Sequence, residues 1–82
     1  VKVFLIGDAS ACSKSGQKVP QGFYNIEIMI KGVLRHNSEI GVCATCMDAR
    51  GIKEEELIEG TTRTTLEALT DWTQLADKVI TF

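Results

Sequence analysis

Two short apolar runs on either side of a helical pattern constrain the fold of this chain more than any other feature. Residues 1–6 (VKVFLI) and Glu39–Cys43 (EIGVC) are rich in apolar and β-branched residues and are too short to be helices. Strands that are buried on both faces, as parallel strands are, have this continuous apolar character. Strands that alternate with helical segments predict an α/β fold with a parallel sheet and right-handed crossovers.

The first helix is predicted to begin after Asn25, which is a favourable N-cap residue. Glu27 follows in the first turn, where a negative charge suits the helix dipole. Apolar residues then recur at helical spacing and form one stripe, made of Ile26, Met29, Ile30, Val33 and Leu34. The preceding segment, residues 13–22, contains serine, glycine and the only proline, and is predicted to be a loop.

A second helix and a third strand are predicted in the last third of the chain. Thr64 and Glu67 have the spacing of a capping box, and the helix that they begin carries Leu66, Leu69, Trp72, Thr73 and Ala76 on one side. Asp77 ends this helix, and the apolar run at residues 78–82 (KVITF) predicts the third strand. Residues 59–62 are predicted to be a loop.

Composition indicates one ordinary globular domain, residues 1–82, in a reducing compartment. Hydrophobic residues make up 44% of the 82 positions and charged residues 24%. The net charge of −2 disfavours a nucleic-acid surface, and no apolar run approaches the ~20 residues of a membrane helix. Three cysteines are an odd number, which is typical of free thiols in the cytoplasm and not of a disulfide scaffold.

The chemistry of the chain is concentrated at residues 42–52 (VCATCMDARGI). Cys43 and Cys46 lie at the carboxyl end of a predicted strand, where open α/β sheets place their sites. Backbone N–H groups of a turn or helix start, together with Arg50, would favour a thiolate there. Asp48 is interpreted as fixing Arg50 or capping the turn, and Gly51 allows a sharp reversal of the backbone.

A second cysteine also follows a predicted strand. Asp8 is predicted to cap a short helix through residues 9–12, and Cys12 then lies at the same sheet edge as the Cys43–Cys46 turn if the strands are close. A small buried apolar side chain is an equally good interpretation of Cys12. No metal site is predicted, because zinc usually takes four ligands and the chain has one cysteine pair. No cofactor is predicted either, because Gly7 lacks the further glycines of a phosphate-binding loop.

Three segments of the sequence resemble a known family. They are Asp8-Ala9 with residues 16–18 and 22–29 (GFYNIEIM), then residues 43–52 (CATCMDARGI), and finally residues 57–60 with the terminal run ADKVITF. With Thr65, Leu66 and Trp72, they span nearly the whole chain. The sequence is similar to the DsrE/DsrF-like family, in its YchN-type subgroup.

The resemblance implies a flavodoxin-like α/β fold, in which helices cover both faces of a parallel sheet. It also implies homo-oligomers, as homotrimers or homohexamers, and a place in a sulfur relay between donor and acceptor proteins. In relatives, sulfane sulfur is carried as a persulfide on the cysteine matched by Cys43, whereas Cys46 belongs to the YchN-like subgroup. Thiol–disulfide redox or sensing, and an oligomeric binding scaffold with structural cysteines, remain as alternatives.

One departure from the family concerns the start of the domain. Relatives have one more strand and helix before the strand matched by residues 1–6. The chain is therefore expected to be N-terminally incomplete and to match the C-terminal three quarters of the family domain. In a flavodoxin-like order, the missing strand is expected between residues 1–6 and Glu39–Cys43, where its absence would leave a gap in the sheet unless another chain or segment fills it.

Overall fold

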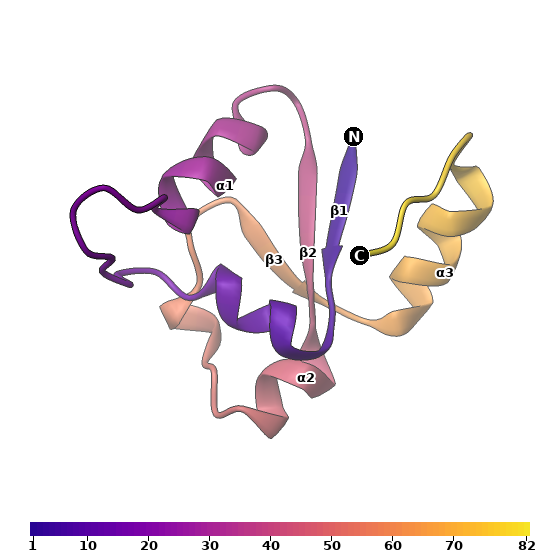
Figure 1. Ribbon diagram of the computed structural model, residues 1–82. Coiled ribbons are helices and arrows are strands. Elements are labelled where there is room, and N and C mark those ends of the chain that lie inside the picture. The colour runs from indigo at the N-terminus through magenta and orange to yellow at the C-terminus, as the bar shows by residue number, and fades with distance from the viewer.

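The computed structural model describes every residue from 1 to 82. Its elements alternate between strands and helices along the chain, as Figure 1 shows. They are strand β1 (Lys2–Leu5), 3₁₀ helix η1 (Gly7–Ser13), helix α1 (Ile26–Leu34), strand β2 (Glu39–Cys43), helix α2 (Ala44–Ala49), 3₁₀ helix η2 (Glu54–Glu56), strand β3 (Thr61–Thr64) and helix α3 (Leu66–Leu75). None of the helices is long and apolar enough to cross a membrane.

The three strands form one parallel sheet in the order β1-β2-β3, which confirms the predicted α/β class. β1 pairs directly with β2, with Lys2 opposite Glu39 and Leu5 opposite Val42. The expected gap between these two strands is therefore wrong. Their backbone N–H and C=O groups bond to each other, so no room is left for a strand between them.

The third strand lies elsewhere than predicted. Residues 78–82 form neither helix nor strand, whereas Thr61–Thr64 forms β3 and overlaps the predicted loop at residues 59–62. Val79 and Ile80 are 59% and 75% exposed, so their apolar side chains are not part of the core. Threonine is β-branched and therefore suits a strand. β3 is the edge strand of the sheet and forms its backbone hydrogen bonds with β2.

Helices cover both faces of the sheet, as predicted, and Figure 1 shows α1 and α3 on opposite sides. On one face, the buried side chains are Ile30, Ile40 and Ile58, and the partly buried side chains packed against them are Val3, Leu5, Cys12, Ile26 and Leu34. On the other face, Trp72 of α3 meets Phe4 edge-to-face, with ring centroids 6.0 Å apart. Gly41 makes this approach possible, because a Cβ there would lie 3.2 Å from Trp72.

The helix starts follow from their capping residues. Asn25 caps α1, as predicted: its Oδ1 accepts the backbone N–H of Glu27 at 3.0 Å and of Ile28 at 3.4 Å. α3 begins one residue later than predicted, after Thr65, whose hydroxyl accepts the N–H of Ala68 at 3.4 Å. The helical assignments are confirmed, with a shift of one residue in the second cap.

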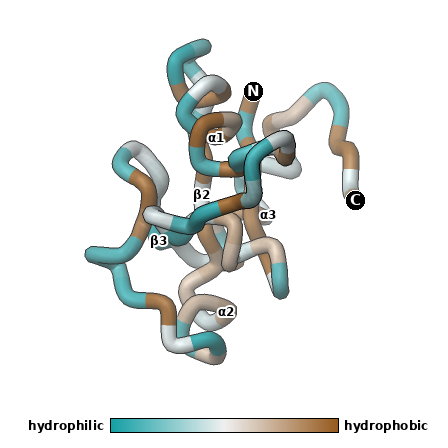
Figure 2. Tube along the Cα trace, turned by 60° about the vertical axis from the view of Figure 1, so that its left-hand side comes forward, coloured by the Kyte–Doolittle hydropathy of each residue, from teal (hydrophilic) through white to brown (hydrophobic).

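Part of the apolar surface is not covered. In Figure 2, hydrophobic stretches lie along α1 and in the tail that leads to the C terminus. Around α1, the exposed large apolar side chains are Phe23, Tyr24, Ile28, Met29 and Val33. The predicted stripe of α1 is therefore split: Ile30 is buried in the core, while Met29 and Val33 lie on the flank of the helix.

Candidate functional site

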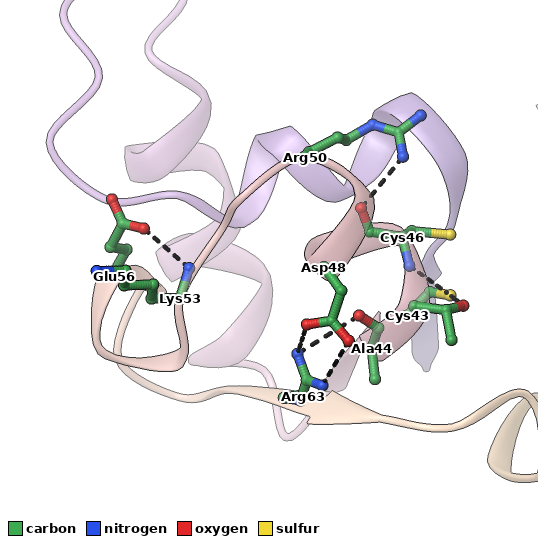
Figure 3. A network of polar contacts seen from close by, with 9 residues as sticks. Cys43, Ala44, Cys46, Asp48, Arg50, Lys53, Glu56 and Arg63 are labelled. Atoms are coloured by element: carbon green, nitrogen blue, oxygen red, sulfur yellow. Dashed lines mark hydrogen bonds and ion pairs between the residues drawn. The ribbon is translucent and has the colours of Figure 1, made fainter.

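The Cys43–Cys46 turn is built at the carboxyl end of β2, where α2 begins at Ala44. Cys43 is itself the N-cap of α2, because its Sγ accepts the backbone N–H of Cys46 at 3.4 Å. The same sulfur lies 3.3 Å from the hydroxyl oxygen of Thr45. Figure 3 shows Cys43 and Cys46 together at the start of the helix. Cys43 is only 1% exposed, so its sulfur is closed off from solvent by this turn.

The surroundings of Cys43 favour its anionic form. Burial raises the pKa of the Cys43 thiol, but hydrogen bonds from the side chains and backbone N–H groups of Cys46 and Thr45 lower it by more. The pKa of Cys43 therefore lies below its ordinary value. A thiol with a lowered pKa is both a thiolate more often and a better leaving group, which are the properties that sulfur exchange needs.

Cys46 is the more accessible sulfur of the turn. It lies in the first turn of α2, as predicted, and is half-buried. Its Sγ accepts the backbone N–H of Gly7 at 3.2 Å, and Gly7 has a φ of 62°, which favours glycine. The ends of β1 and β2 therefore meet at this sulfur. Gly51, with a φ of 66°, reverses the chain after α2, as the sequence predicted.

Arg50 connects the cysteine turn to the end of β1. Its guanidinium donates to the backbone carbonyl of Cys46 at 3.1 Å and to the Asp8 carboxylate at 2.6 Å. Asp8 is the main cause of the raised pKa of Arg50, and the nearby sulfurs of Cys46 and Cys43 contribute in the same direction. Arg50 thus lies within electrostatic range of both thiols.

Two predicted roles of the acidic residues are wrong. Asp8 does not cap the short helix, because η1 begins after Ile6 with no side-chain cap, and its carboxylate binds Arg50 instead. Asp48 neither fixes Arg50 nor caps the turn. It forms a two-point ion pair with Arg63 of β3, at 2.9 and 3.1 Å, which lowers the pKa of Asp48.

Arg63 is the site residue that the sequence analysis missed. Besides binding Asp48, it donates to the carbonyl of Ala44 at 3.4 Å, so it holds α2 against β3. The predicted loop ends at residue 62 and the predicted helix begins at Thr64, so Arg63 is given no role by the sequence analysis. The alternating TTRT pattern, interpreted as an edge strand, would have placed this arginine beside the cysteine turn.

Cys12 is separate from the other two thiols in its contacts. It lies on η1 and packs against the aliphatic cluster of Ile30, Ile40 and Ile58, and no hydrogen bond joins it to Cys43 or Cys46. His36 lies in the exposed turn that follows α1. The structure has no group of three His, Cys, Asp or Glu side chains that could hold a metal ion. The arrangement therefore supplies a pair of thiols, hydrogen-bond donors and the guanidinium of Arg50, while Arg63 holds α2 in place.

Comparison with known proteins relates this turn to a family. The model of the DsrE/DsrF-like family matches residues 1–82, the whole chain. The chain belongs to the DsrE/DsrF-like family. Membership in this family associates the chain with sulfur relay in general.

Individual DsrE/DsrF-like relatives agree with this assignment. Protein YchN of Escherichia coli (strain K12) is 42% identical over 82 residues, which are all of this chain and 69% of YchN. The crystal structure of YchN from E. coli superimposes with a TM-score of 0.91 over 99% of this chain and 68% of that chain. The protein MK0008 of Methanopyrus kandleri is 35% identical over the same 82 residues, which are 67% of its length. The parallel α/β fold is thus shared with a solved member and is compatible with a flavodoxin-like architecture.

Proposed function

We propose that this protein is a sulfur carrier that holds sulfane sulfur as a persulfide on the Cys43–Cys46 turn. The observation that carries the proposal is the hydrogen-bonded, anion-favouring environment of Cys43 at a strand end, with Cys46 and Arg50 beside it. Family membership supports relay chemistry in general.

The transfer requires no oxidant and no cofactor. A thiolate of the turn attacks the outer sulfur of a donor persulfide, R–S–SH. The new S–S bond forms on the cysteine of the turn, the old S–S bond breaks, and the donor leaves as the thiolate R–S⁻. The proton stays on the transferred sulfur, so atoms and electrons balance. The backbone N–H groups and the Thr45 hydroxyl that now face the sulfur of Cys43 would stabilise the anion before attack.

Mass spectrometry after incubation with a persulfide donor tests this function. The wild-type protein is expected to gain about 32 Da, the mass of one sulfur atom, on a peptide that contains Cys43 or Cys46. Cys43→Ser and Cys46→Ser identify the carrier, because loss of either thiol removes one of the two positions. Cys12→Ser is the matched control, since Cys12 packs in the aliphatic cluster. A wild-type protein that gains no sulfur under these conditions would refute the proposal.

Thiol–disulfide redox is the second candidate function. It is favoured by one observation: the backbone N–H of Cys46 donates to the Cys43 sulfur at 3.4 Å, so the two cysteines lie next to each other at the start of α2. Attack of one thiolate on a persulfide carried by the other would release sulfide and leave a disulfide. In the same experiment this reaction gives a loss of two protons and no added sulfur.

We also propose that the protein works as a homo-oligomer, a homotrimer or homohexamer, in the cytoplasm. The exposed apolar side chains around α1, with Ile28 64% and Met29 51% exposed, support self-association because burial of such a surface is favourable. Sedimentation velocity at micromolar concentration tests this. A single monomer peak would count against the assembly but not against the sulfur chemistry. Unmodified cysteines in an intact assembly would favour the scaffold interpretation instead.

A further inference from the structure

A small cleft lies next to the cysteine turn, between α2 and the start of α3. Its volume is about 260 Å³, and it is lined by Ala44, Thr45, Thr64, Thr65, Leu66 and Glu67. The lining consists of three threonines, one alanine, one glutamate and one leucine that is 50% exposed. The cleft therefore has an apolar floor that is open to solvent.

Two residues of the cleft lining adjoin Cys43. Thr64, in its lining, is the residue directly opposite Cys43 in the β2–β3 ladder, and neighbouring strands lie about 4.8 Å apart. Thr45, also in its lining, contacts the Cys43 sulfur through its hydroxyl at 3.3 Å. Thr45 therefore contacts the Cys43 sulfur and also lines the cleft, and an exposed side chain such as Thr45 changes rotamer within nanoseconds.

One charged residue lines the cleft. Glu67 is exposed and has no ion-pair partner in the structure, so its full negative charge acts at the opening. The nearest cation in sequence, Arg63, is occupied by Asp48 on α2. A polypeptide that approaches the cleft therefore passes one unpaired carboxylate at its opening, which favours positively charged flanking residues over negatively charged ones.

We propose that this cleft is the entry for an acceptor thiol borne on a polypeptide, and that Glu67 selects acceptors with basic flanking residues. This inference rests on the proposed carrier function and adds the route and the specificity. The acceptor thiolate attacks the outer sulfur of Cys43–S–SH. A new S–S bond forms on the acceptor, the bond at Cys43 breaks, and Cys43 leaves as a thiolate. The proton remains on the transferred sulfur, so no net oxidation occurs.

A charge-reversal experiment tests the selection. Protein pre-loaded with persulfide is mixed with one of two hexapeptides that carry a central cysteine, flanked by lysines in one and by glutamates in the other. Peptide mapping follows the loss of sulfur from Cys43. The measured quantity is the transfer rate to the lysine-flanked peptide divided by the transfer rate to the glutamate-flanked peptide. This ratio is expected to fall about two- to fivefold in Glu67→Lys relative to wild type, as for one surface charge contact. Glu67→Gln is expected to give an intermediate ratio.

The control separates a local effect from one of net charge. Glu55→Lys changes the total charge equally, but Glu55 is exposed on η2 and does not line the cleft, so it should leave the ratio unchanged. The different intrinsic reactivities of the two peptides cancel, because the same pair is used for every variant. Equal ratios in wild type, Glu67→Lys and Glu55→Lys would overturn the cleft while leaving the carrier function intact. A wild-type protein that takes up no sulfur would overturn both.

Discussion

Replacement of Thr45 by valine should make Cys43 less reactive at moderate pH. Valine keeps the shape of the threonine side chain but removes the hydroxyl that lies 3.3 Å from the Cys43 sulfur. That hydroxyl is one of the groups that lower the pKa of Cys43. Without it, burial is opposed by fewer hydrogen bonds, so the pKa of Cys43 rises and the thiolate fraction falls.

The size of the effect follows from the geometry. A hydrogen bond to a charged group contributes roughly 1.5–3 kcal/mol to its stability. Thr45 is exposed and sulfur is a weak acceptor, so water replaces part of the contact and about 1 kcal/mol is a reasonable value here. With 1.36 kcal/mol equal to a tenfold change, the thiolate population should fall about fivefold at any pH below the midpoint of the titration.

Alkylation by iodoacetamide across a pH series, with peptide mapping at Cys43, measures this effect. The pH at which the rate is half-maximal reports the pKa of the Cys43 thiol, whereas the plateau at high pH reports how easily the reagent reaches the sulfur. Thr45→Val should move the midpoint to higher pH, and Thr45→Ser, which keeps the hydroxyl, should leave it in place. If the valine and serine variants share one midpoint, the hydroxyl does not stabilise the anion and the reasoning about Cys43 is wrong.

Further predictions concern stability. Gly41→Ala should lower the free energy of unfolding by about 1–3 kcal/mol in urea titrations, because the new Cβ would lie 2.9 Å from Thr64 Cγ2 in a packed face. Gly32→Ala should instead raise it by about 0.5–1 kcal/mol, since Gly32 is helical and its Cβ would meet only the end of a flexible side chain, at 3.7 Å. The ion pair of Asp48 with Arg63 lowers the pKa of Asp48, so its stabilisation is present above the ordinary pKa of an aspartate, about 3.9, and is lost as pH falls through the lower folded value. The wild type should therefore lose its advantage over Asp48→Asn progressively as the pH falls below about 4, and a difference that stays constant below that pH would contradict this assignment.

The features of this fold that sequence predicts well are those encoded by local pattern. The apolar runs predicted β1 and β2, and Asn25 predicted the start of α1, because strand burial and capping depend on residues close in the chain. The Cys43–Cys46 turn was placed correctly at a strand end for the same reason. Gly51 also followed from local chemistry, since its positive φ closes a six-residue helix.

The features that sequence reasoning missed depend on what is distant in the chain but adjacent in space. The tail at residues 78–82 has strand-like composition, but a strand also needs a bonded neighbour, and β3 takes the place beside β2. The ion pairs also depend on contacts between segments that are distant in the chain. Asp48 pairs with Arg63 and not with Arg50, which is closer in sequence, because the sheet brings β3 beside α2. The direct pairing of β1 with β2 likewise depends on the order of strands in the sheet, which local sequence patterns do not encode.

The position of Trp72 gives this protein a built-in optical reporter. It is the only tryptophan of the chain, and its ring rests against Phe4 and Gly41 on the face that α3 covers, with the Lys2 ammonium 4.9 Å from its centroid. Its fluorescence will therefore report whether α3 is seated on the sheet, and nothing about the opposite layer. A red shift in emission that precedes the loss of far-UV ellipticity would identify α3 as the first part of the molecule to detach.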